Sequence, residues 1–260
     1  MQAGGSPVLE DFLGQVARDV SDPVTGQSLW QKDSHLVPLG SGSDYTPFVH
    51  HLGIASLNLG FADPGARGCY HSAYDDLYWY EHFSDSNFAY GRALAQLNAT
   101  ALIRLADAPI VPVNAAGLAE TVAQSLPEIE KLDHGHRVML TGARVELDKL
   151  RRGAAAFEAA YARALPRLDE FAPQKLAALN EKLFRLERSL APSGLPGRPW
   201  YRHHIFAPGM YTGYNAVALP GIREAIEAQN WLEANRQAAE LASVLRNVTA
   251  QVRDAERMLE

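Results

Sequence analysis

The fold depends on three consecutive motifs between Gly40 and Trp79: Gly40-Ser-Gly-Ser-Asp44, then Leu52-Gly-Ile-Ala-Ser-Leu-Asn-Leu-Gly-Phe61, then Tyr70-His-Ser-Ala-Tyr-Asp-Asp76. A Gly/Ser loop, an apolar segment and a Tyr-His loop in succession are typical of α/β enzymes, which present polar groups at the carboxyl ends of their strands. The mostly apolar residues 54–61 predict a buried strand of a parallel sheet. This stretch therefore predicts an α/β fold.

Helices are expected on both sides of this strand. Residues 1–7 are interpreted as a flexible lead-in, and helical spacing of apolar residues predicts a helix over 9–20. A short helix is expected over 45–52, capped by Ser43 or Asp44, and a loop over 62–68. From Ser84 onward the pattern predicts a long apolar helix, capped by Ser84 or Asp85.

The composition changes at about Pro112. From Ala115 to Glu260, Ala, Leu, Glu and Arg dominate and no convincing strand is found. Helical periodicity predicts four helices, over 115–131, 140–165, 170–190 and 222–258. A long proline-containing segment, 191–221, is expected to be irregular, and its aromatic residues favour an ordered functional loop. We therefore expect an α/β piece over 1–112, followed by an all-α helical bundle over 113–260, and a mostly helical chain.

The predicted α/β piece is incomplete, because a lone strand cannot satisfy its backbone hydrogen bonds. Residues 1–112 are therefore expected to be the C-terminal part of a larger α/β domain. Its exposed partial sheet would be prone to aggregation unless it is paired.

Charge and composition exclude several classes of protein. A net charge of −6 argues against a nucleic-acid-binding surface, which requires a basic face. No apolar run approaches the ~20 residues of a membrane span, and no signal-peptide core is recognisable, so the sequence predicts no compartment. The single cysteine, Cys69, excludes an internal disulfide.

His71 is the strongest candidate for chemistry. It could act as a metal ligand or general base, with Tyr70 donating a hydrogen bond to a developing oxyanion, or it could be a structural histidine paired with Asp75 or Asp76. No second ligand lies at metal-binding spacing in the sequence. A nucleophilic role for Cys69 is disfavoured relative to a small buried side chain.

Other polar and aromatic positions leave alternatives open. The histidine pairs at 50–51, 134/136 and 203–204 favour surface or packing roles, because adjacent residues diverge on a helix. Tyr214 could line a ligand pocket or could pack between helices.

Together with three later motifs, the Gly40–Trp79 stretch resembles the glutamate carboxypeptidase II family in collinear order over nearly the whole chain. The later motifs are Asp107-Ala-Pro-Ile-Val-Pro112, Gly194-Leu-Pro-Gly-Arg-Pro-Trp-Tyr-Arg-His203 and Leu219-Pro-Gly-Ile222. This family comprises N-acetylated-α-linked acidic dipeptidase-like zinc peptidases related in fold to the transferrin receptor. The resemblance implies a zinc-dependent exopeptidase, of carboxypeptidase or dipeptidase type, that acts on small peptides. It also implies that residues 113–260 are a transferrin receptor-like dimerisation domain, and hence a homodimer.

The resemblance also implies roles for individual residues. His71 matches the last zinc ligand of the family, and Tyr70 matches the tyrosine that stabilises the tetrahedral intermediate. Ser43 falls in a loop at the substrate cleft, and Tyr214 falls in the loop that closes over the C-terminal residue of the substrate. Asn58 stands where the family has an arginine of the acidic-substrate pocket.

Two further departures, Gly60 in place of an arginine and Gly213 in place of a lysine, argue with Asn58 against a preference for acidic dipeptides.

The remaining zinc ligands and the catalytic glutamate of the family match nothing in this sequence. Since a catalytic zinc takes about three protein ligands, the chain is expected to be a C-terminal portion that is inactive alone, with two zinc ions held only by the complete parent. The alternative is a non-enzymatic binding or dimerisation module of transferrin-receptor type. Tyr70 and His71 favour the enzyme, because a receptor has no need of a ligand-bearing loop.

Overall fold

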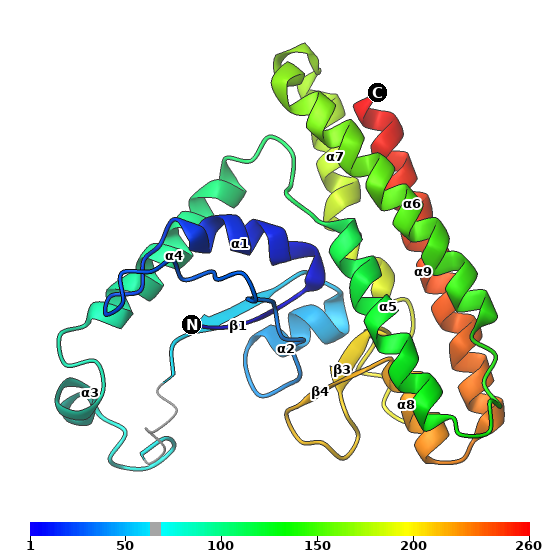
Figure 1. The fold of residues 1–260 in the computed structure, drawn as a ribbon, viewed down its shortest axis with the longest axis horizontal. Coiled ribbons are helices and arrows are strands. Elements are labelled where there is room, and N and C mark those ends of the chain that lie inside the picture. The colour runs from blue at the N-terminus through cyan, green and yellow to red at the C-terminus, as the bar shows by residue number, and fades with distance from the viewer. Residues whose placement is uncertain (63–68) are drawn as a thin grey trace.

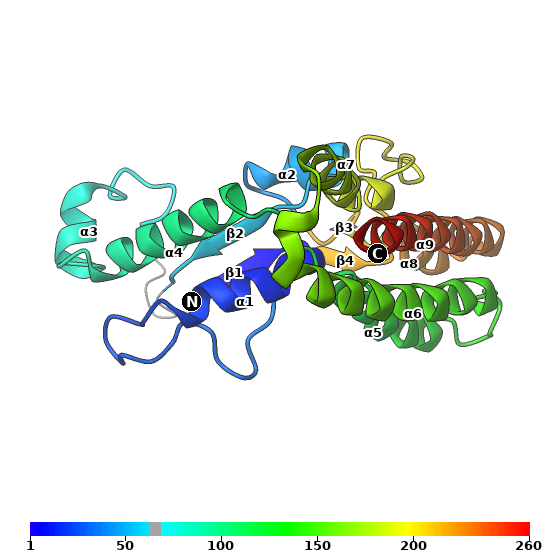
Figure 2. The ribbon, with the colours of Figure 1, turned by 90° about the horizontal axis from the view of Figure 1, so that it is seen from above.

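The structure is a computed structural model that describes residues 1–62 and 69–260, and helices dominate it, as expected (Figure 1). The loop predicted over 62–68 therefore lies almost entirely outside the described residues. Seen from above, the first half of the chain and the helical half lie side by side along the long axis (Figure 2). No helix in the described ranges is long and apolar enough to cross a membrane.

Strand β1 (Gln2–Gly5) pairs with β2 (Leu57–Gly60) in an antiparallel, two-stranded sheet. Two predictions are therefore wrong: residues 2–5 are not a flexible lead-in, and the strand at 57–60 is neither parallel nor buried. Glycine has low strand propensity, which hides β1 in the sequence. The glycines allow close packing here, because a Cβ on Gly5 would lie 2.6 Å from Leu57 Cδ2 and that side chain would have to move.

Helices α1 (Glu10–Arg18) and α4 (Ala89–Ala106) lie together near this sheet (Figure 1). They bury a separate apolar cluster that includes Leu13, Val16 and Leu97 and that also contacts the sheet. Both helices were predicted from their apolar spacing. A 3-10 turn, Pro7–Leu9, leads into α1.

A short helical segment follows the Gly/Ser loop, and another follows the Tyr-His motif. As predicted, residues 45–52 are helical, as α2 (Tyr45–Pro47) followed by a short π-helix (Phe48–Leu52). Helix α3 (Leu77–Phe83) was not predicted, although Asp76 caps it by accepting a hydrogen bond from Trp79 N at 2.9 Å.

Asp85, which precedes α4 (Ala89–Ala106), caps the N-terminus of that helix with its side chain. Its carboxylate accepts hydrogen bonds from Tyr90 N at 3.2 Å and Gly91 N at 2.8 Å, which satisfies two free N–H groups of the first turn. The helix itself begins at Ala89, later than the sequence suggested, and the N-cap residue is Phe88.

The helical half follows the predicted periodicity closely. Its helices are α5 (Ala115–Leu132), α6 (Thr141–Ala164), α7 (Pro173–Phe184), α8 (Pro220–Glu227) and α9 (Trp231–Leu259), with 3-10 segments at Leu165–Glu170 and Glu187–Leu190. The single helix predicted over 222–258 is broken, because Gln229 has φ of 55° and Asn230 caps α9 by accepting from Glu233 N at 3.1 Å.

The segment 191–221 contains strands β3 (Phe206–Pro208) and β4 (Ala216–Ala218), which pair antiparallel with Phe206 opposite Ala218. The prediction that no strand follows Ala115 is therefore wrong. Each strand has only three residues, which is too short to reveal a period-2 pattern.

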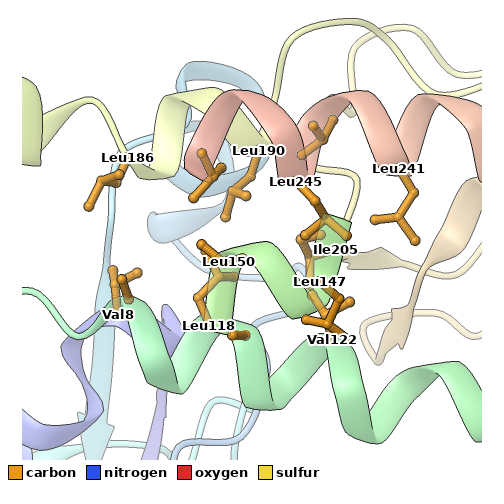
Figure 3. Close-up of a cluster of buried hydrophobic side chains, with 14 of the residues drawn as sticks. Val8, Leu118, Val122, Leu147, Leu150, Leu186, Leu190, Ile205, Leu241 and Leu245 are labelled. Atoms are coloured by element: carbon orange, nitrogen blue, oxygen red, sulfur yellow. The ribbon is translucent and has the colours of Figure 1, made fainter. Parts of the chain in front are cut away.

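The main apolar core lies between α5, α6 and α9 (Figure 3). Leu118, Leu150 and Leu245 are buried there, one from each helix. Val8 and Val49, from the first half of the chain, belong to the same cluster. The core is thus continuous across the domain boundary predicted near 112, and that boundary stays a prediction.

Candidate functional site

The Gly40–Ser43 loop packs against the segment that contains Tyr214. Ser41 N donates a hydrogen bond to the Tyr214 carbonyl oxygen at 2.9 Å. A Cβ on Gly40 would lie 1.7 Å from that oxygen, and a Cβ on Gly42 (φ 100°) would lie 2.8 Å from the Tyr214 ring. Only glycine permits this approach. The structure therefore brings together two predicted substrate-site segments that lie about 170 residues apart in sequence.

A pocket of about 1010 Å³ lies beside this contact. Asn58, from β2, and Tyr214 both line it, together with Gly40 and Ser41. Ser43 lies on the same loop but not in the lining. The remaining lining comes mainly from residues 1–4 and 29–39, and no lysine or arginine side chain is among the described residues that line the pocket.

Tyr70 and His71 lie elsewhere, in an exposed turn before α3. Tyr70 is 78% exposed, and the two rings stack with centroids 3.8 Å apart. His71 has φ of 62°, a left-handed conformation that is uncommon outside glycine. Neither residue lines the pocket, so the structure does not bring them together with Asn58 and Tyr214 within this chain.

In the part of the chain that the structure describes, no hydrogen bond or ion pair joins His71 to Asp75 or Asp76. Asp76 Oδ1 instead caps α3, and Asp75 lies 3.9 Å from the Cys69 thiol. Cys69 is buried, and burial together with the Asp75 carboxylate raises the pKa of its thiol. A thiol with a raised pKa is a poor nucleophile, which agrees with the structural interpretation of Cys69.

Across residues 1–62 and 69–260, no group of three or more His, Cys, Asp or Glu side chains is arranged to hold a metal ion. His71 therefore stands as a single imidazole. A catalytic zinc takes about three protein ligands, so the residues described do not by themselves fit a zinc site.

A buried polar cluster, which the sequence did not indicate, lies where the two halves of the chain meet. Glu187 Oε1 accepts a hydrogen bond from Ser6 Oγ at 2.7 Å and lies 3.2 Å from His203 Nε2. Phe206 N donates to His203 Nδ1 at 3.2 Å, which leaves the proton on Nε2 to be donated to Glu187. All three side chains are buried, so the cluster links β1 to the segment before β3. Nothing local could have revealed a pair of residues 181 positions apart.

His50 is buried beside this cluster, and its ring lies edge-on to that of His203 at 6.2 Å. Burial, and then the neighbouring His203, lowers the pKa of His50 to about 4. His50 is therefore neutral near pH 7. The sequence assigned it a packing or surface role, and the structure shows a buried, hydrogen-bonded ring.

Comparisons with known proteins agree with this picture. Residues 138–253 match the family model of the transferrin receptor-like dimerisation domain. A probable glutamate carboxypeptidase of Arabidopsis thaliana is 31% identical over 236 residues, covering 86% of this chain and 33% of that protein. An aminopeptidase of Rattus norvegicus is 27% identical over 273 residues, covering 91% and 36% respectively. An inactive zinc metalloprotease of Schizosaccharomyces pombe is 24% identical over 225 residues, covering 82% and 28%.

The matches define the class as peptidase-like chains that carry a transferrin receptor-like dimerisation domain. The chain is a member of the glutamate carboxypeptidase II-like family, as its motifs indicated. It spans about a third of the length of the curated relatives that it matches.

Proposed function

We propose that this chain is the C-terminal portion of a zinc-dependent metallo-exopeptidase, of carboxypeptidase or dipeptidase type, that hydrolyses small peptides. The observation that carries the proposal is the pocket between the Gly40–Ser43 loop and Tyr214, because a concave site lined by both apolar and hydrogen-bonding side chains suits the end of a peptide. The names of the relatives, glutamate carboxypeptidase and aminopeptidase, support the same reaction class. The activity would belong to a complete parent protein.

In that parent, His71 would be one zinc ligand and Tyr70 would donate a hydrogen bond to the oxyanion of the attacked carbonyl. Their exposure supports these roles, because both side chains are free to contact residues supplied by other parts of the parent. The other ligands of two zinc ions would come from those parts, and this chain alone would be inactive.

The pocket lining disfavours an acidic substrate residue, since Asp33 is among the described lining residues and no lysine or arginine is. Asn58 and Tyr214 offer neutral hydrogen-bonding groups, whereas an acidic substrate side chain would need a cationic partner to offset its loss of hydration. Ser43 would contact the substrate from the rim of the same loop.

A dipeptide panel assayed with the complete parent tests this function. Dipeptides with neutral C-terminal residues should be cleaved faster than those ending in glutamate, and a zinc chelator should abolish both rates. Absence of hydrolysis across the panel, with zinc added, would reject the proposal.

The helical half supports a second element of the proposal, homodimer formation through residues 113–260. The family match over 138–253 is its basis. Light scattering after size exclusion should give a mass twice the 28.4 kDa of the chain. A strict monomer at high protein concentration would contradict this proposal.

The alternative function is a non-enzymatic binding or dimerisation module of transferrin-receptor type. It is favoured by the relative named as an inactive zinc metalloprotease, and the domain match is compatible with it. Both functions include dimerisation, so the hydrolysis panel distinguishes them. A dimeric parent that cleaves no dipeptide of the panel would support the non-enzymatic module.

A further inference from the structure

His50 connects the two walls of the pocket. Its Nε2 lies 2.6 Å from the carbonyl oxygen of Gly40, which belongs to the Gly/Ser loop. Since a carbonyl can only accept, Nε2 carries the proton and donates it to this bond. The backbone carbonyl of His50 in turn accepts a hydrogen bond from Arg202 N at 2.7 Å. Arg202 begins the segment that leads through β3 to Tyr214.

The ring of His50 is held in place from several sides. It lies edge-on to Phe206 and Tyr201, with centroids 6.0 Å away in each case, and to His203. His203 is itself fixed by its contact with Glu187 and by the hydrogen bond from Phe206 N. A buried ring packed among fixed neighbours can direct its donor at one carbonyl with little freedom.

We propose that His50 is a positioning residue of this pocket, which holds the Gly40–Ser43 loop in register with Tyr214 through its hydrogen bond to Gly40. The next residue, Ser41, makes the only described backbone bond from this loop to the Tyr214 carbonyl. Loss of the His50 donor would leave the Gly40 carbonyl without its buried partner, and the loop would separate from Tyr214. That the pocket takes a substrate rests on the proposed function, whereas the positioning of the loop does not.

Amide hydrogen exchange of the chain, measured by mass spectrometry on a peptide spanning residues 38–45, tests the proposal. His50→Leu fills the space but donates nothing, and exchange in this peptide should rise about tenfold, the effect of losing one hydrogen bond. His50→Gln restores an N–H donor and should stay within about threefold of wild type. If His50→Leu does not fold, His50→Asn replaces it, because its amide is too short to reach Gly40.

Leu245→Ala, in the core of the helical half, is the matched control, since it destabilises the chain without touching the pocket. In Leu245→Ala, exchange in residues 38–45 should rise no more than the lower global stability of that variant accounts for. Three results would each overturn the proposal: exchange in residues 38–45 that is unchanged in His50→Leu, exchange there that rises as much in His50→Gln as in His50→Leu, or the same local rise in Leu245→Ala. No substrate is used, so an inactive parent would leave this result intact. In an active parent, His50→Leu should raise KM more than it lowers kcat.

Discussion

Gly40→Ala should destabilise the chain by about 3 kcal/mol or more, at the upper end of what overpacking costs. The new methyl group would lie 1.7 Å from the Tyr214 carbonyl oxygen and 2.8 Å from Ala216 N. Both are backbone atoms, so no side-chain rotation relieves the overlap. The loop and the β3–β4 connection must move apart, and the bond from Ser41 N to Tyr214 O breaks with them.

Gly60→Ala is the control for this substitution, because Gly60 lines the same pocket but a Cβ there would meet no heavy atom within 4 Å. Urea unfolding of both variants checks the prediction. Gly60→Ala should remain close to wild type in free energy of unfolding. A Gly40→Ala variant as stable as Gly60→Ala would show that the loop does not approach Tyr214 this closely.

Acid should weaken the fold through His50. Its pKa is about 4 in the folded chain and near 6.5 when unfolded, so between these values the unfolded state binds more protons. Stability from this group is complete above pH 6.5 and is lost progressively as the pH falls from 6.5 to 4, below which both states are protonated. Between pH 7 and pH 4.5 the loss is about 2 to 3 kcal/mol, at about 1.36 kcal/mol per pKa unit.

His50→Gln isolates this effect, since glutamine does not titrate. Burial also lowers the pKa of His204, so His204 also reduces stability in acid. That loss is present in both wild type and His50→Gln. Unfolding free energies at pH 7 and pH 4.5 should therefore show a smaller acid-induced loss for His50→Gln than for wild type. Equal losses in the two proteins would mean that His50 is not buried in its neutral form.

The helical half could be predicted from sequence, because its helices bury one face each and show it as a 3.6-residue period. Leu118, Leu147 and Leu245 are examples of such positions. The break before α9 escaped detection, since a single residue with positive φ, Gln229, interrupts an otherwise continuous pattern. Strand β1 was not predicted because its glycines, which allow close packing, have low strand propensity.

The pocket was predictable only in part. The resemblance singled out Asn58 and Tyr214, which line the pocket, and Ser43, which does not. It could not show that the Tyr214 backbone packs against Gly40. The Ser6–Glu187–His203 cluster could not be predicted, because its three residues are far apart in sequence and belong to no motif. Their burial depends on tertiary contacts. Histidine pairs at 50–51 and 203–204 gave no indication that one member of each faces the other.

The zinc content of the complete parent, before and after His71→Ala, tests the central claim most directly. His71→Asn and Tyr70→Phe are useful companions, the first removing the ligand with less change of shape and the second leaving it in place. If His71 is one ligand of a two-zinc site, wild type and Tyr70→Phe should retain about two zinc ions per protomer, whereas both His71 variants should lose zinc, as ligand loss weakens a site of about three protein ligands. Unchanged zinc content in His71→Ala would contradict the assignment and the peptidase account built on it.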